Sequence, residues 1–253
     1  MLKKTLVLTY GIVCYSLFFA VFNYAILFIG NIIVTPSLDS VGHSNLLEAL
    51  VVDIGLLAAF ALQHSIMARP AFKRLWTKMV PVQIERSTYV LASSILLGFV
   101  VYFWQPLGGV IWHISDPVAM TVVYALFAIG WAILFLASFQ INHFDLFGLR
   151  QVWLYFRGKS YTQIAFKTPW LYRYTRHPLY VGLMIGLWAA PTMTVAHLVF
   201  AVLCTAYIFI GTRLEERDLE NALPEYKQYK QDVPMFMPKL GGKIEKDISL
   251  ESV

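Results

Sequence analysis

The sequence predicts an all-α membrane protein, a polytopic helix bundle with four full spans, a C-terminal helical hairpin and a cytoplasmic cap. The chain has 253 residues, of which 58% are hydrophobic and only 14% charged. An ordinary soluble domain carries about a quarter charged residues. The two cysteines, Cys14 and Cys204, lie in separate apolar runs, which argues against a disulfide framework or a metal site.

Four apolar runs are long enough to cross a bilayer, since a helix needs about twenty apolar residues to span about 30 Å of hydrocarbon. These spans cover about residues 6–34, 46–67, 88–106 and 118–139. A fifth apolar region, 179–212, is too long for one straight span and contains Pro191, which removes a backbone hydrogen-bond donor. We expect two shorter helices there, joined near Pro191 as a hairpin.

The loop charges set the expected orientation. The segment after the second span carries five basic residues and one acidic residue, whereas the connections 35–45 and 105–116 contain no lysine or arginine. Basic loops stay in the cytoplasm, so both termini are expected there too. This bias accounts for the net charge of +5 without nucleic acid as a partner. We interpret residues 1–253 as a single domain, with 140–178 and 213–253 forming the cap.

Charged residues gather at both ends of the expected hairpin. Arg176-His177-Pro178 stands at its entrance, and Glu215-Glu216 follows its second helix. Basic side chains donate hydrogen bonds to carboxylates, and glutamates accept them from ammonium or hydroxyl groups. Pro178 suits a helix start, where its missing donor is harmless. On charge type alone, these residues fit interface anchors and a solvated helix equally well.

Histidines and a carboxylate lie where the second and fourth spans reach the same membrane face. His64 is near the end of the second span, and His143 and Asp145 follow the fourth. Ionisable residues at membrane depth are costly, which makes His64 a functional candidate. A carboxylate can orient an imidazole, so Asp145 and His143 form a useful pair. The structural alternatives are a neutral His64 bonded to its sequence neighbours and ordinary capping by the pair.

The pattern Arg-His-Pro-x-Tyr-x-Gly at 176–182, followed by a hairpin and Glu-Glu-x-x-Leu at 215–219, resembles the cofactor site of integral-membrane methyltransferases that use S-adenosylmethionine (SAM). That group includes isoprenylcysteine carboxyl methyltransferase and phospholipid N-methyltransferases. Segments 63–69 and 142–151 resemble the methanethiol S-methyltransferase branch. The resemblance implies SAM-dependent methylation of a small thiol, methanethiol to dimethyl sulfide, in a bacterial inner membrane. Its partners are then the thiol and membrane lipids.

The resemblance also implies the residues of the cofactor site. The tail containing Tyr226 and Tyr229 resembles the aromatic segment that such enzymes fold over SAM, and Gly182 would permit close backbone approach. The cofactor-binding residues expected on this basis are Arg176, His177, Pro178, Tyr180, Gly182, Glu215, Glu216, Tyr226 and Tyr229. No metal ligand set is expected.

Methyl transfer from a sulfonium is an in-line displacement that needs an anionic nucleophile. A cysteine thiol has a pKa near 8.5 and a simple alkyl thiol is less acidic, so a base should help to form the thiolate. The candidates are His64 and the His143/Asp145 pair, with Glu215 as the second choice.

Two other functions remain open at this stage. One is a membrane methyltransferase that acts on a prenylcysteine carboxylate or a lipid amine, which requires a wide lateral opening. The other is a non-catalytic carrier of haem or a small molecule, with haem between His64 and His143. The sequence has no Cys-x-x-Cys-His motif to support haem attachment.

Overall fold

Five helices of the computed structural model are long and apolar enough to cross a membrane, within the described residues 1–42 and 45–237. They are α1 (Leu2–Ile29), α2 (Leu46–Ala68), α4 (Glu85–Phe103), α5 (Pro117–Gln140) and α9 (Val195–Ala222). Helix α8 (Pro178–Trp188) is apolar but has only 11 residues. The predicted polytopic bundle is confirmed, but the number of full-length spans differs from the expected four. The hairpin consists of one short helix, α8, and one full-length helix, α9.

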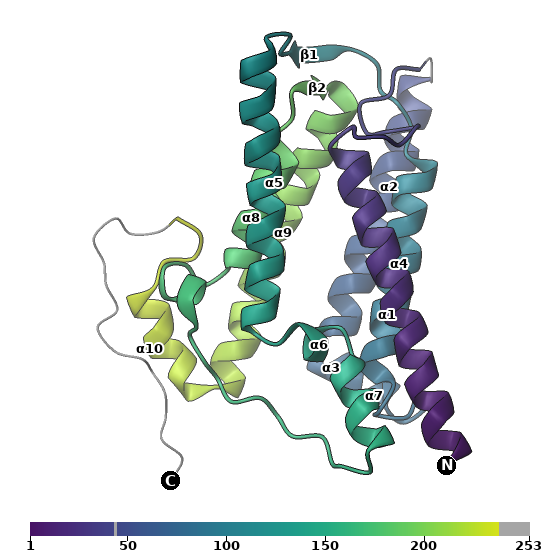
Figure 1. Ribbon diagram of the computed structural model, residues 1–253, viewed down its shortest axis with the longest axis vertical. Helices are drawn as coiled ribbons and strands as arrows, with labels where there is room; N and C mark the ends of the chain where they lie inside the picture. The colour runs from purple at the N-terminus through teal and green to yellow at the C-terminus, as the bar shows by residue number, and fades with distance from the viewer. Residues whose placement is uncertain (43–44, 238–253) are drawn as a thin grey trace.

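Shorter elements close the two ends of the bundle (Figure 1). One end holds the N-terminus and the helices α3 (Pro70–Trp76), α6 (His143–Leu146), α7 (Leu149–Phe156) and α10 (Pro224–Asp232). The 3₁₀ helix Trp170–Arg173 precedes α8. At the other end, β1 (Val110–His113) pairs antiparallel with β2 (Thr192–Thr194). We call the end that holds the N-terminus and α10 the basic end, and the end that holds β1 and β2 the ribbon end. The expected cap extends into residues 238–253, which lie outside the described residues.

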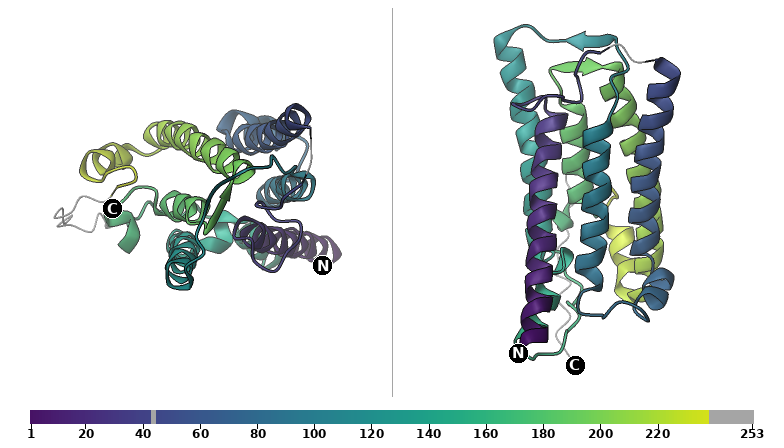
Figure 2. Two further views of the ribbon diagram at one scale, coloured as in Figure 1. Left: turned by 90° about the horizontal axis from the view of Figure 1, so that it is seen from above. Right: turned by 90° about the vertical axis from the view of Figure 1, so that its right-hand side faces the viewer.

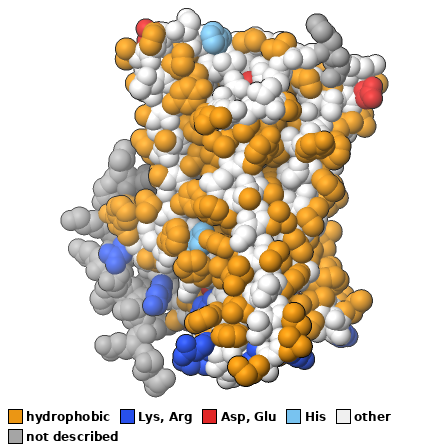
Figure 3. Space-filling model, turned by 45° about the vertical axis from the view of Figure 1, so that its right-hand side comes forward, with side chains coloured by type: hydrophobic (Ala, Val, Ile, Leu, Met, Phe, Trp, Pro, Cys, Tyr) orange, Lys and Arg blue, Asp and Glu red, His pale blue; other side chains and the backbone are white. Residues whose placement is uncertain are grey.

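Charge is distributed unequally between the two ends. Lysine and arginine side chains gather at the basic end, while hydrophobic side chains cover the flank of the bundle (Figure 3). Large apolar side chains in the middle of spans are exposed, for example Phe99 at 48% and Val122 at 55%. Apolar side chains on spanning helices can face lipid without the cost they would have in water.

In the view along the bundle axis, α1, α2 and α4 lie on one side and α5 and α8 on the other (Figure 2). Helix α9 contacts both α8 and α2 and so connects the two sides. Helix α5 packs along α8 through glycines. A Cβ atom at Gly182 would lie 2.5 Å from the carbonyl oxygen of Gly130, so only glycine allows this approach. Small residues at helix contacts let backbones approach closely in membranes. The close approach expected at Gly182 is therefore made to α5.

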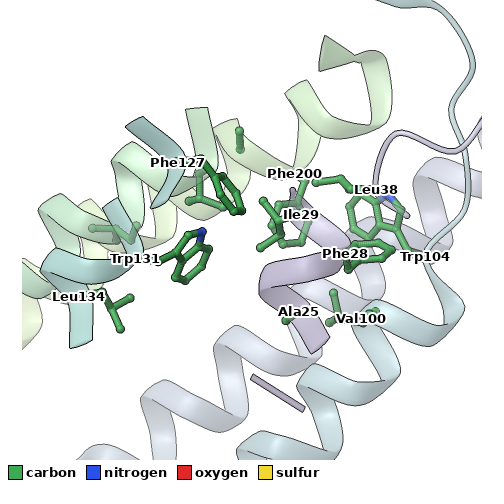
Figure 4. Packing of buried hydrophobic residues seen from close by; sticks show 14 residues of the cluster. Ala25, Phe28, Ile29, Leu38, Val100, Trp104, Phe127, Trp131, Leu134 and Phe200 are labelled. Carbon is green, nitrogen blue, oxygen red and sulfur yellow. The ribbon is translucent and has the colours of Figure 1, made fainter. Parts of the chain in front are cut away.

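The apolar core fills the half of the bundle next to the ribbon end (Figure 4). It combines the C-terminal turns of α1 and α4 with the middle of α5 and the first turns of α9. Phe28 and Leu38 are almost completely buried, and Trp104 packs edge-on against Phe200 at 5.1 Å. Buried hydroxyl and imidazole groups lie mainly beyond this core, toward the basic end.

A buried polar network closes the ribbon end. The Asp39 carboxylate accepts from the Thr194 backbone N–H at 3.0 Å and from the Thr194 hydroxyl at 2.9 Å. The His197 ring nitrogens lie 2.9 Å from Asp39 Oδ2 and 2.9 Å from the Leu187 carbonyl oxygen. Both partners can only accept, so a protonated His197 satisfies both bonds. The network ties the loop after α1 to both hairpin helices.

Replacing His197 with alanine should lower the free energy of unfolding by about 3–5 kcal/mol, because the change leaves a buried carboxylate without its cationic partner. Thermal unfolding in detergent measures the effect. His113→Ala is the matched control, since His113 is exposed on β1 and contacts the Thr192 hydroxyl at 3.0 Å. Equal melting temperatures for the two variants would contradict this role of His197.

Candidate active site

A buried ion pair joins the two ends of the hairpin. Arg176 Nε donates to Glu216 Oε1 at 2.7 Å, and His177 Nε2 lies 2.9 Å from the same oxygen. Lys230 Nζ lies 3.4 Å from Glu216 Oε2. Glu216 is 2% exposed, so its charge depends on these partners for compensation. The structure brings together Arg176, His177 and Glu216 as expected, but they bind one another.

The same arginine holds the C-terminal segment. Its Nη1 donates to the carbonyl oxygens of Lys230 and Val233, and its backbone N–H donates to the Pro234 carbonyl at 2.9 Å. The Thr175 hydroxyl donates to the Met235 carbonyl at 2.8 Å. The tail after α10 is therefore folded against the turn that begins α8.

Helix α10 contributes buried aromatic hydroxyl groups to this cap. Tyr229 donates to the Tyr172 carbonyl at 2.6 Å, and both Tyr226 and Tyr229 pack against Phe166. Burial raises the pKa of the Tyr226 and Tyr229 hydroxyls, so they remain neutral. The Tyr226 hydroxyl and Glu225 Oε2 are buried without a hydrogen-bond partner among the described residues.

His64 is the centre of a second polar cluster, between α2 and α4. The Ser93 hydroxyl donates to Gln63 Oε1 at 3.2 Å, and so its oxygen accepts from His64 Nδ1 at 3.2 Å. The Tyr89 hydroxyl lies 2.9 Å from His64 Nε2 and 3.1 Å from Nδ1, and Phe60 stacks on the imidazole at 5.3 Å. Because Ser93 accepts from Nδ1, the ring proton of neutral His64 is on Nδ1. Nε2 is then the basic nitrogen.

The hairpin adds a carboxylate to this cluster. The Tyr180 hydroxyl donates to Glu215 Oε2 at 3.0 Å, which joins α8 to α9. The Tyr207 hydroxyl bonds to the Ser65 hydroxyl at 3.0 Å, which joins α9 to α2. Tyr89 and Tyr180 both interact electrostatically with Glu215 and Tyr207. Groups from four helices therefore converge at the same depth; we call His64, Tyr89, Tyr180, Tyr207 and Glu215 the polar belt.

Pro178 takes its expected place as the first residue of α8, and Gly182 lies one turn later against α5. The Tyr180 ring stacks on His177 at 5.6 Å, so this tyrosine contacts both the ion pair and the polar belt. The expected cofactor residues therefore form one continuous region, from α10 through the start of α8 to Glu215.

His143 has partners other than Asp145. Ser138 donates its hydroxyl proton to the Phe135 carbonyl, so His143 Nδ1 donates to Ser138 Oγ at 2.9 Å and Nε2 accepts from Tyr15 at 2.8 Å. The ring stacks on Phe139 at 4.3 Å and is 3% exposed. Burial lowers the pKa of His143 and keeps the ring neutral.

Asp145 orders the segment that follows α6 instead. Its carboxylate binds Arg150 Nη1 at 2.9 Å and accepts from the Tyr161 hydroxyl at 3.2 Å. The expected orientation of His143 by Asp145 is not formed in the structure. Among the described residues, hydrogen bonds link neither side chain to the polar belt.

Sequence reasoning missed Tyr89, Ser93 and Tyr207, all within apolar helices. A tyrosine in a span can equally be a rim residue, so the sequence carried no distinguishing signal. Tyr89 lies three residues beyond Arg86, and Ser93 lies one helical turn beyond Tyr89; this spacing could have indicated a polar face on α4.

Comparisons with known proteins identify the family. A protein-family model described as NnrU protein matches residues 53–237. The protein named methanethiol S-methyltransferase from Crocosphaera subtropica is 51% identical, over 96% of this chain and 95% of its own length. Its namesake from Mycobacterium tuberculosis is 44% identical, over 94% and 98%. The chain belongs to the methanethiol S-methyltransferase family.

Members with this name cover nearly the whole chain, whereas other relatives cover less. Nurim from Bos taurus is 32% identical over 72% of this chain and 72% of its own length. No solved structure matches the chain significantly. Across residues 1–42 and 45–237, no group of three His, Cys, Asp or Glu side chains is placed to hold a metal ion.

The ion pair provides a direct test of the cap in this methyltransferase. Glu216→Gln should weaken the attachment of α10 and residues 233–236 by about 1.5–3 kcal/mol, the range for a hydrogen bond to a charged group. Amide hydrogen exchange in residues 224–236 should accelerate accordingly. Glu220→Gln is the control, one turn later on α9, where Glu220 pairs with the exposed Lys230. Unchanged exchange in Glu216→Gln would show that the cap is held by other contacts.

Proposed function

We propose that this protein is an integral-membrane enzyme that transfers the methyl group of SAM to methanethiol and releases dimethyl sulfide. Two lines of reasoning support the proposal. Relatives named methanethiol S-methyltransferase align with more than nine-tenths of the chain. The observation that carries it is the placement of a basic imidazole nitrogen, His64 Nε2, in the same polar belt as the hairpin carboxylate Glu215.

The chain offers chemical partners for each part of SAM. Glu225 Oε2 and the Tyr226 hydroxyl, which interacts with Glu216, are polar groups that suit the ammonium or ribose groups. Arg176 and His177 supply positive charge for the carboxylate, and the rings of Tyr180, Tyr226 and Tyr229 supply aromatic surface. When bound, SAM would supply an electrophilic methyl carbon attached to its sulfonium sulfur. Glu215, which accepts from Tyr180 between the cap and His64, would supply negative charge to that sulfonium.

His64 acts as the base in this proposal. Its Nδ1–H is fixed by Ser93, which orients the ring and keeps Nε2 available for a proton. The thiol loses its proton toward Nε2, and the thiolate sulfur attacks the methyl carbon in line with the breaking C–S bond. His64 then carries the proton as imidazolium. His143 and Asp145 hold α6 and the segment 150–162 in place at the mouth of the site.

The position of the belt suits an apolar substrate. His64, Tyr180, Tyr207 and Glu215 lie on helices that span the membrane or enter it, and each side chain keeps part of its surface accessible. A volatile thiol partitions into lipid and can reach such a site from the bilayer. The thioether product can leave by the same route.

The activity is tested by incubating purified protein with SAM and a panel of methanethiol, amines and prenylcysteine analogues. Dimethyl sulfide should appear in the headspace only with methanethiol. Methylation of an amine or a prenylcysteine carboxylate instead would contradict the choice of acceptor.

His64→Gln should still bind SAM but lower turnover of methanethiol by about a hundredfold to ten-thousandfold, the usual contribution of a general base. The defect should shrink as pH rises, because solution thiolate accumulates. Calorimetry measures SAM binding, and His113→Gln is the control at the ribbon end. If His64→Gln turns over methanethiol at the parental rate near neutral pH, His64 is not the base, and Glu215 becomes the candidate.

We also propose a single domain with its basic end in the cytoplasm of a bacterial inner membrane. The basic end carries α3, where Lys73 and Arg74 stand, and the ribbon end carries the uncharged turn 105–109. Reporter fusions at residue 78 and at the C-terminus should give cytoplasmic signals, and a fusion at residue 110 should give an external one. A cytoplasmic signal at residue 110 would reverse the orientation.

A further inference from the structure

Both ring nitrogens of His64 already have neighbours that block direct contact with a substrate. Nδ1 is bonded to Ser93 Oγ, whose own proton is donated to Gln63. The Tyr89 hydroxyl lies 2.9 Å from Nε2 and 3.1 Å from Nδ1, so it contacts both ring nitrogens and is nearer to Nε2. A thiol that approaches His64 therefore meets the Tyr89 oxygen first, unless the tyrosine moves.

Tyr89 is held firmly in this position. The residue is 8% exposed, its ring lies 5.2 Å from the His64 ring, and the Arg86 guanidinium stands 5.4 Å from its centroid. The hydroxyl donates to Nε2, since Nε2 is the acceptor nitrogen of this tautomer. The oxygen keeps its own acceptor capacity, and its electrostatic neighbours are Glu215 and Tyr207.

The other hydroxyls of the belt are less suited to the same task. Tyr180 donates its proton to Glu215, and Tyr207 is bonded to Ser65. Neither has a hydrogen bond to an imidazole among the described contacts. Within the polar belt, Tyr89 is the hydroxyl that contacts the His64 imidazole directly.

We propose that Tyr89 is a catalytic residue that contacts the thiol and relays its proton to His64, an inference that rests on the proposed function. The S–H bond breaks as the Tyr89 oxygen takes that proton, and the original Tyr89 proton passes to Nε2. Tyrosine ends neutral, imidazole becomes imidazolium, and the electron pair of the S–H bond stays on sulfur. That pair forms the new C–S bond as the sulfonium C–S bond breaks and its electrons return to the donor sulfur.

The test compares two thiols of similar size and different acidity, ethanethiol and the much more acidic 2,2,2-trifluoroethanethiol. Tyr89→Phe keeps the ring and removes only the hydroxyl. With ethanethiol the variant should lose about a hundredfold or more in kcat/KM, the lower range for proton-transfer catalysis. With trifluoroethanethiol, which is largely ionised in solution near neutral pH, the loss should be small. SAM binding by calorimetry should match the parent and confirm that the variant is folded.

Tyr124→Phe is the matched control, since Tyr124 lies on α5 and its hydroxyl contacts only the Gly30 carbonyl, at 3.5 Å, among the described residues. This control should keep parental rates with both thiols. Equal losses for Tyr89→Phe on the two thiols, or no loss on either, would overturn the relay while leaving the proposed function intact. A parent protein that methylates neither these thiols nor methanethiol would refute the proposed function, and the relay with it.

Discussion

The buried carboxylate of Glu216 is the constraint on which the basic end depends. A charge in a weakly polar environment needs compensation, and Glu216 receives it from Arg176 and His177 before α8 and from Lys230 on α10. Arg176 extends the same arrangement to backbone carbonyls of the tail. Because the glutamate is on α9, these bonds fix the cap relative to the long helix of the hairpin. The neighbouring Glu215 then points toward α8 and the polar belt.

The unequal hairpin explains how the charged cap comes to lie beside His64, the base that we propose. Helix α8 has 11 residues, whereas α9 has 28 and continues beyond the first residue of α8. At 1.5 Å per residue, α8 reaches only about half of a 30 Å hydrocarbon layer. Its first turn therefore starts inside the bundle, where Tyr180 contacts both His177 and Glu215. The glycine contact with α5 holds this short helix in place.

The helices could be predicted from the sequence because hydrophobic run length alone indicates a span. The hairpin ends could also be identified, since Arg176 and Glu216 stand at apolar boundaries. Neighbours in sequence misled the interpretation of His143 and Asp145: residues two apart on a helical turn point in different directions, so each found other partners. Tyr89 contacts His64, and Asp39 contacts His197. Both contacts join segments that are distant in the sequence, so no local pattern specifies them. The β1–β2 pairing escaped prediction for the same reason.

Charge balance gives a reason why a neutral imidazole suits a methyl transfer at this depth. His64 gains a positive charge in the same step in which the sulfonium loses one, so the net charge of the site stays constant. Glu215 therefore faces one cation before and after the transfer, and the cost of placing its carboxylate in a weakly polar region does not change. A carboxylate base would instead lose its own charge as the sulfonium loses one, so two opposite charges would disappear from the site together. A base that starts neutral and is oriented by Ser93 avoids this reorganisation within the membrane.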